Sequence, residues 1–406
     1  MVGILLLTFF QSLEIARAAE DARVTVAKRV LADFQAGAPR NHRVLHVAYF
    51  CPADRTPAPD FQERLGRVLG DISGFYAAQV RQYGLPCDGI PLDKDADGKL
   101  VIHLVKGTRP AAEYSEAKSS GDIYNDVKKV VEEEGIGLKT NHVVVFTRLG
   151  NFDGTNSSHN SPYCGRGDGH DGFCWQFDSD ILDTRLLQNT DRRTNDKQYG
   201  HINLGKYNSI FIGGTAHELG HLFGLPHNDT TPDDLKGPGH SLMGDGNRFY
   251  REELHGGAKS TFIPLADALR LVSNPIFSHV DKGISEKWRS SITNCQIDTS
   301  VAEQSKITGE YKSNQPIYGV IAYANPNVDD DHGEFAYAGT LGPNNTFSIE
   351  LGPLPRPRKQ KTADFRIILL CASGQHLSAG SGTAAPFRKP YTLGEGGRIV
   401  IGDSPR

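Results

Sequence analysis

The stretch from His217 to His227, HELGHLFGLPH, limits what this chain can fold into more than any other part of the sequence. On a helix, positions i and i+4 lie on the same face, so the imidazoles of His217 and His221 can bind one metal ion together. Gly224 can take a left-handed backbone conformation at little cost, so the chain can leave the helix there and bring His227 to the same ion. Three imidazole ligands leave a fourth position open, which is typical of a catalytic zinc site.

Glu218 directly follows the first histidine and is predicted to be a general base. A zinc ion lowers the pKa of water from about 15.7 to about 7 and polarises a carbonyl oxygen. Glu218 could take the proton from the attacking water and pass it to the leaving amine of a peptide bond. Chance would produce the full pattern HExxHxxGxxH in about one of ten thousand such chains. This disfavours the alternative, an amphipathic helix with solvated histidines.

The same residues resemble the zinc-binding signature of the metzincin clan of metallopeptidases. That clan carries a methionine-containing turn beneath the zinc, and Ser241-Leu242-Met243-Gly244 offers one; Met243 is the only methionine besides the initiator. The resemblance implies a catalytic domain with a twisted mixed sheet and helices, and a zinc helix between upper and lower subdomains. Asn228 and Asp245 do not match the residues that mark the commonest subfamilies, so the resemblance supports the clan alone.

Hydrophobic periodicity predicts two kinds of structure along the chain. Before the signature and after a polar lead at 19–43, buried strands at 44–50, 100–105 and 141–147 alternate with helices at 60–83 and 111–134. This order indicates an α/β layer with mainly parallel strands. A Gly-rich segment at 150–205 reads as long loops. It is followed by a short strand at 207–212, the zinc helix at 215–223 and another helix at 264–272.

Beyond residue 295, short alternating segments separated by turn residues predict a β-sandwich. Its expected strands are 317–324, 334–337, 346–351, 365–371 and 398–401. The predicted division is therefore a signal peptide at 1–18, a metzincin-like zinc peptidase domain at 19–290 and a β-sandwich domain at 296–406. The fold class is α+β or α/β with an appended β-sandwich.

The N-terminus and the cysteines indicate export. Residues 2–10 are apolar and Ala16-Arg17-Ala18 matches a cleavage site, as in a signal peptide; the alternative is an N-terminal helix that packs on the domain. The apolar run is too short to cross a bilayer, so we expect a secreted or periplasmic protein without stable membrane insertion. The six cysteines fit disulfides in an oxidising compartment, and the sequential pairing keeps each bridge local: Cys51–Cys87, Cys164–Cys174 and Cys295–Cys371.

Other charged residues offer weaker signals. The net charge of −4 with mixed signs argues against nucleic acid as a partner, and we expect a monomer that acts on a protein or peptide. Ca²⁺ is a second candidate cofactor, because residues 93–98 resemble half of an EF-hand loop and acids cluster at Asp168, Asp171, Asp178 and Asp180. A plain turn and solvated loop acids are the favoured interpretations, and the same holds for the run 329–331.

Three functions fit the sequence. The first is a secreted zinc endopeptidase that binds substrate as an added strand along a sheet edge, formed by either 207–213 or 173–177. The second is an exported binding or adhesion protein with a structural or vestigial zinc site, although such a site has no use for a base at Glu218. The third is a zinc hydrolase that acts on a non-peptide amide, which the motif alone does not exclude.

Overall fold

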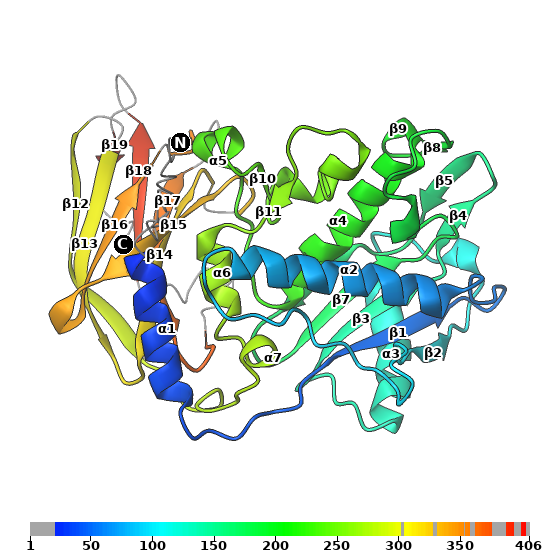
Figure 1. Cartoon of the computed structure of the whole chain (residues 1–406), viewed down its shortest axis with the longest axis horizontal. Helices are drawn as coiled ribbons and strands as arrows, with labels where there is room; N and C mark the ends of the chain where they lie inside the picture. Colours follow the sequence, from blue (N-terminus) through cyan, green and yellow to red (C-terminus); the bar gives the residue numbers. More distant parts are fainter. Residues whose placement is uncertain are drawn as a thin grey trace, which may run out of the picture.

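The computed structural model describes residues 21–301, 304–327, 331–352, 354–357, 362–375, 387–393 and 399–402. The predicted signal peptide lies outside these residues. Figure 1 shows a mixed α/β half, coloured from blue to green, beside a β half coloured from yellow to red. The mixed α/β architecture with a C-terminal β-sheet structure agrees with the predicted fold class in outline. Within the described residues, no helix is long and apolar enough to cross a membrane.

A mixed sheet of five strands forms the centre of the α/β half. Its spatial order is β2 (His103–Lys106), β1 (Leu45–Cys51), β3 (His142–Thr147), β7 (Gly172–Phe177) and β6 (Cys164–Gly167). The first four strands run parallel and β6 is antiparallel to β7, which confirms the predicted layer of mainly parallel strands. Every residue of β3 and β7 is buried, because helices cover both faces of such a sheet.

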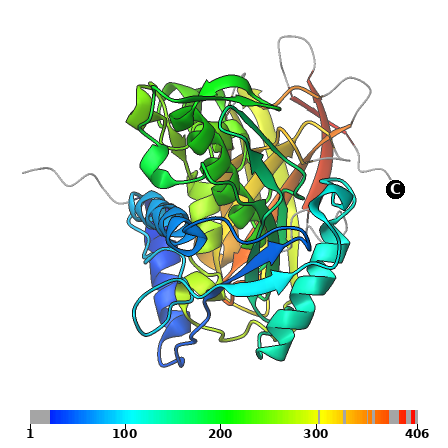
Figure 2. The same ribbon diagram turned by 90° about the vertical axis from the view of Figure 1, so that its right-hand side faces the viewer.

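Two helices cover opposite faces of this sheet (Figure 2). Helix α2 (Phe61–Arg81) confirms the predicted helix at 60–83 and packs one apolar face on the sheet. The predicted helix at 111–134 is shorter than expected: Ala111–Glu113 form a 3-10 turn, and α3 covers Ser120–Glu133. Tyr114 interrupts the helix because its backbone is extended. Its ring packs edge-on against the ring of Phe50, with 5.2 Å between the two centroids.

Helix α4 (Leu204–Leu222) is continuous and packs against β6 and β7. It contains the predicted zinc helix, but the predicted strand at 207–212 is wrong. Nearly every residue of α4 is buried, so apolar residues lie on all sides of the helix. The sequence therefore lacks the amphipathic period of a helix that is buried on one face. Position 213, inside the helix, requires glycine because a Cβ there would come within 2.1 Å of the Asn247 carbonyl oxygen.

Shorter elements surround α4. The segment predicted as long loops contains a four-stranded sheet of β4 (Gly150–Phe152), β5 (Asn156–His159), β8 (Arg193–Asp196) and β9 (Gly200–Asn203). After α4 come α5 (Pro232–Lys236), β10 (His240–Ser241), β11 (Thr261–Phe262), α6 (Leu265–Leu271) and α7 (Pro275–Ser278). Helix α6 confirms the predicted helix at 264–272.

The β half is one antiparallel sheet that folds over itself into a nearly closed sandwich. Its order is β12 (Ser290–Val301), β13 (Gln304–Ser313), β16 (Thr346–Leu351), β15 (Phe335–Leu341), β14 (Ile317–Asn325), β17 (Ala363–Cys371), β18 (Phe387–Leu393) and β19 (Ile399–Ile401). Strand β15 pairs with β14 along its first part and with β16 at Thr340 and Leu341, so it joins the two layers. The five predicted strands here are confirmed, while β12, β13 and β18 were not predicted.

The two halves share a broad apolar contact through β14. Val320 and Ala322 face the core of the β half, whereas Ile321 and Tyr323 face the core of the α/β half. All nine residues of β14 are therefore buried. Helix α1 (Ala22–Gln35), in the segment interpreted as a polar lead, packs on β14 and β15 and adds to this contact.

The predicted disulfides are not present: all six cysteines lie in the described residues and each is a free thiol. Cys174 lies opposite Gly165 and Cys164 lies opposite Trp175, so the two thiols point to opposite faces of the β6–β7 hairpin. Cys51 ends β1, whereas Cys87 lies in the loop that returns to the start of that strand. Cys295 and Cys371 lie on β12 and β17, which are not neighbours in the sheet.

Candidate metal centre

The structure brings the three histidines of the signature together. His217 and His221 lie one turn apart on α4, and their Nε2 atoms are 3.1 Å from each other. Gly224 ends the helix with φ of 86°, and the chain turns back so that the ring of His227 lies 4.6 Å from that of His221, measured between centroids. Ligand atoms of all three side chains lie within 4.8 Å of one another.

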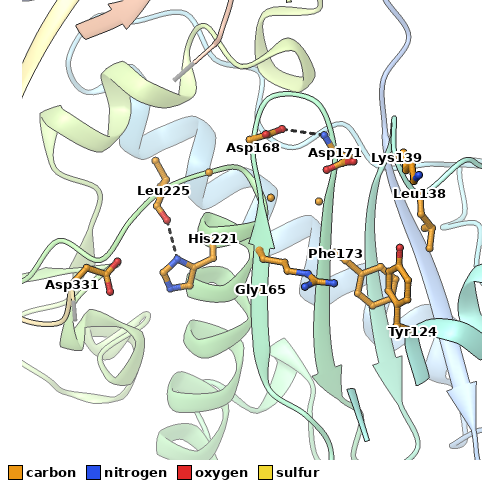
Figure 3. A pocket seen from close by; sticks show the side chains of 14 residues that line it. Tyr124, Leu138, Lys139, Gly165, Asp168, Asp171, Phe173, His221, Leu225 and Asp331 are labelled. Atoms are coloured by element: carbon orange, nitrogen blue, oxygen red, sulfur yellow. Dashed lines mark hydrogen bonds between the residues drawn. The ribbon is translucent and has the colours of Figure 1, made fainter. Parts of the chain in front are cut away.

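Each imidazole is oriented by a hydrogen bond from its Nδ1 atom. His217 donates to the Leu242 carbonyl oxygen at 2.7 Å. His221 donates to the Leu225 carbonyl oxygen at 2.8 Å, as Figure 3 shows. A carbonyl oxygen can only accept, so Nδ1 carries the proton and Nε2 keeps its lone pair. Burial lowers the pKa of His217 to about 3 and that of His221 to about 4, and neighbouring imidazoles add to both shifts.

These donor atoms fit a bound cation. Two neutral imidazoles whose bare Nε2 lone pairs face each other at 3.1 Å cannot hydrogen-bond to each other. A zinc ion would bind both lone pairs together with the third imidazole, leaving one position open. The residues present therefore suit zinc.

Met243 packs against α4. It is fully buried, and its Sδ would be only 2.4 Å from a Cβ at Gly220, the residue before His221. The carbonyl that holds His217 belongs to Leu242, so the same turn both supports the helix and orients a histidine.

A carboxylate from the β half holds the third histidine. Asp331, which lies between β14 and β15, accepts a 2.7 Å hydrogen bond from Nδ1 of His227, and the ring of His332 lies 3.9 Å from the ring of His227. The prediction that Asp331 is a solvated loop acid is therefore wrong. No sequence signal links it to His227, because the two residues are 104 positions apart.

The two residues after His227 are also bonded to the β half. The Asn228 side chain accepts from the backbone N–H of Ala336, and the backbone N–H of Asp229 donates to the Glu334 carbonyl oxygen at 2.7 Å. Three consecutive residues of the ligand loop thus contact one short segment of the β half.

Glu218 lies between the helix and the edge strand β6. Burial raises the pKa of Glu218 to about 8, while a hydrogen bond from the Gly165 backbone lowers it in part. A Cβ at Gly165 would come within 2.0 Å of the Glu218 carbonyl oxygen, so only glycine permits this approach. Neither predicted substrate edge is correct: 207–213 is helical and β7 is internal, whereas β6 is the edge of this sheet.

A cavity of about 460 Å³ opens beside His221 (Figure 3). Its wall combines charged, aromatic and backbone groups, which include Tyr124, Lys139, Arg166, Asp168, Asp171 and Phe173. Asp331 and His221 also line it, so the cavity reaches the histidine cluster.

The remaining candidates lie elsewhere or serve other contacts. Asp178 is a buried ion-pair partner of Arg64 at 2.8 Å, which argues against calcium at that acid. Residues 95–98 form a turn, as favoured.

Comparison with known proteins gives a fold relationship. No family model and no curated protein matches the chain. Three crystal structures of OgpA from Akkermansia muciniphila are similar in fold. Two are wild-type crystal forms with TM-scores of 0.67 and 21% identity, covering 88% and 90% of this chain and 95% and 97% of OgpA. The third, catalytically inactive OgpA with an O-glycopeptide substrate, has a TM-score of 0.70 and 20% identity, covering 90% and 97%. The chain therefore shares the OgpA fold over both of its halves.

Proposed function

We propose that this chain is a secreted zinc-dependent endopeptidase of the metzincin clan, which acts as a monomer with Glu218 as its general base. The observation that carries the proposal is the convergence of three imidazoles beside the half-buried carboxylate of Glu218, under the edge of a sheet. The fold shared with OgpA, a protein crystallised with a glycopeptide substrate, supports a peptide substrate.

The chemistry follows from the groups in place. Bound zinc supplies a polarised carbonyl and a water molecule that loses its proton near neutral pH. Glu218 accepts that proton, since its burial makes the carboxylate more basic than in water. It then delivers the proton to the leaving amine. Strand β6 binds an extended peptide through its backbone, which holds the scissile bond over α4.

The cavity beside His221 supports a narrower substrate class. Its volume of about 460 Å³ falls within the range of small-molecule pockets, and its charged and aromatic wall suits a polar, ring-shaped group. We propose that it accepts a sugar on an O-glycosylated residue next to the scissile bond. A glycopeptide and its sugar-free form, digested in parallel and analysed by mass spectrometry, test this. Equal cleavage of both would contradict the proposal that the cavity binds a sugar, but it would agree with the peptidase proposal.

Glu218→Ala tests the peptidase proposal itself. The variant should keep its zinc but lose turnover by about 10²- to 10⁴-fold, the usual contribution of a general acid–base group. A chelator should abolish the activity of the wild type. Glu133→Ala, which removes an exposed carboxylate at the end of α3, is the matched control and should cleave normally. Turnover by Glu218→Ala at the wild-type rate would contradict the proposal.

A further inference from the structure

A second group of metal-ligating side chains lies at the opposite edge of the sheet. His46 on β1, His103 on β2 and Asp93 on the loop before β2 offer ligand atoms within 4.8 Å of one another. Because His103 lies opposite Ala48 in the parallel pair, His46 and His103 share one face of the sheet. None of these residues belongs to the catalytic centre described above.

Asp93 is held in place by the backbone. Its N–H donates to the Leu45 carbonyl oxygen, and its own carbonyl oxygen accepts from Val101. The carboxylate therefore faces His46 from a fixed position, with 2.9 Å between Oδ2 and the Nδ1 of His46.

His103 carries the clearest sign of a missing ligand. Its side chain is 8% exposed and its Nδ1 atom bonds to Glu134, which follows α3. Its Nε2 atom is buried and has no hydrogen-bond partner. Leaving a buried polar atom without a partner is unfavourable, so this nitrogen calls for a ligand. Histidines that bind a metal commonly donate their other nitrogen to a carboxylate, and this is the arrangement of His103 with Glu134.

The charges of the cluster also favour a cation. Asp93 faces Nδ1 of His46 and Glu134 bonds Nδ1 of His103, so each imidazole has a carboxylate partner. Two imidazoles with a carboxylate are ligands typical of zinc, and the partly exposed Asp93 leaves the site open to solvent.

We propose that His46, Asp93 and His103 bind a second divalent ion of the zinc class, which ties β2 and its preceding loop to β1. The competing interpretation is a plain His46–Asp93 ion pair. That interpretation leaves Nε2 of His103 without a partner, whereas a metal ion satisfies all three side chains at once.

Metal counting on the full-length chain tests the proposal. Protein stripped by a chelator is dialysed against zinc, and the bound metal is measured by atomic emission. We expect about two zinc ions per wild-type chain, and about one in either His103→Gln or His221→Ala. His103→Gln should keep its peptidase activity, and the double variant should bind none. His201→Gln is the matched control, because this exposed ring bonds Asn195 in the small sheet, and it should bind two.

The outcomes separate this site from the catalytic one. Zinc should still raise the Tm of His221→Ala but not that of the double variant. If His103→Gln does not fold, judged by circular dichroism, Asp93→Asn at the surface replaces it and should also bind about one ion. A single zinc ion per wild-type chain, or no loss in both His103→Gln and Asp93→Asn, would overturn the proposal while leaving the peptidase proposal intact.

Discussion

Replacing Asp331 tests whether the β half helps to build the metal centre. Asp331 orients a ligand of the metal: it accepts the Nδ1 hydrogen of His227 at 2.7 Å. Partial burial acts to raise the pKa of Asp331, but the hydrogen bond and charge of His227 outweigh it and hold that pKa well below its usual range. The carboxylate is therefore ionised, fixes the tautomer of His227 and increases the basicity of Nε2.

The expected loss can be estimated from this contact. Removing the outer partner of a ligating histidine costs about 10- to 100-fold in metal affinity. The bond is short and the Asp331 side chain is only 25% exposed, so Asp331→Ala should lie near the upper end. A loss of about 100-fold corresponds to about 2.7 kcal/mol. Asp331→Asn keeps an oxygen that can accept the hydrogen bond but removes the charge, so about tenfold is expected.

Competition with a chromogenic chelator measures the zinc affinity of each variant. Peptidase turnover at saturating zinc should recover largely, because the substitution weakens binding of the ion and leaves Glu218 in place. Asp233→Asn is the matched control, since this exposed acid pairs with Lys236 in α5, and the zinc affinity of that variant should be unchanged. If Asp331→Ala binds zinc as tightly as the wild type, the contact with His227 does not support the metal.

Two further substitutions test packing and charge. Gly220→Ala should lower the free energy of unfolding in urea by about 1–3 kcal/mol and weaken zinc binding, because the new Cβ would come within 2.4 Å of Met243 Sδ. The control Gly70→Ala in α2, where a Cβ meets nothing within 4 Å, should stabilise the protein by about 0.5–1 kcal/mol. Equal effects of the two substitutions would refute the reasoning. Burial raises the pKa of Asp267 to about 7. The stability that the protonated carboxyl contributes is therefore fully present below the unfolded pKa of about 3.9 and is lost as the pH rises through 7. Asp267→Asn should remove that decline in unfolding free energy, and an unchanged pH dependence would contradict it.

The fold was predictable where the pattern of apolar residues had a single interpretation. The helix at 60–83 and the strands at 44–50 and 141–147 were found because apolar residues repeat with a clear period or form a short buried run. Helix α4 was misinterpreted in its first half because it is buried all round. The small strands at 150–203 carry too few apolar residues to be distinguished from loops.

The candidate site was predictable only where its residues lie close together in the sequence. His217, His221 and His227 lie within a few turns of chain, so spacing alone brought them together. Asp331 was not found, because a run of acids is normally solvated and only tertiary structure brings it to His227. The edge strand β6 was missed for the same reason, since its position depends on the pairing with β7.

The two halves of the chain make different contributions to the candidate metal centre. Two histidines lie on the rigid, buried helix α4, whereas His227 lies on a loop that needs support from outside. That support comes from the segment at 331–336, which contacts three consecutive residues of the loop. Strand β14, buried on both faces, fixes this segment relative to the α/β half. Binding of the ion and docking of the β half therefore stabilise each other, because thermodynamic coupling between two sites is reciprocal.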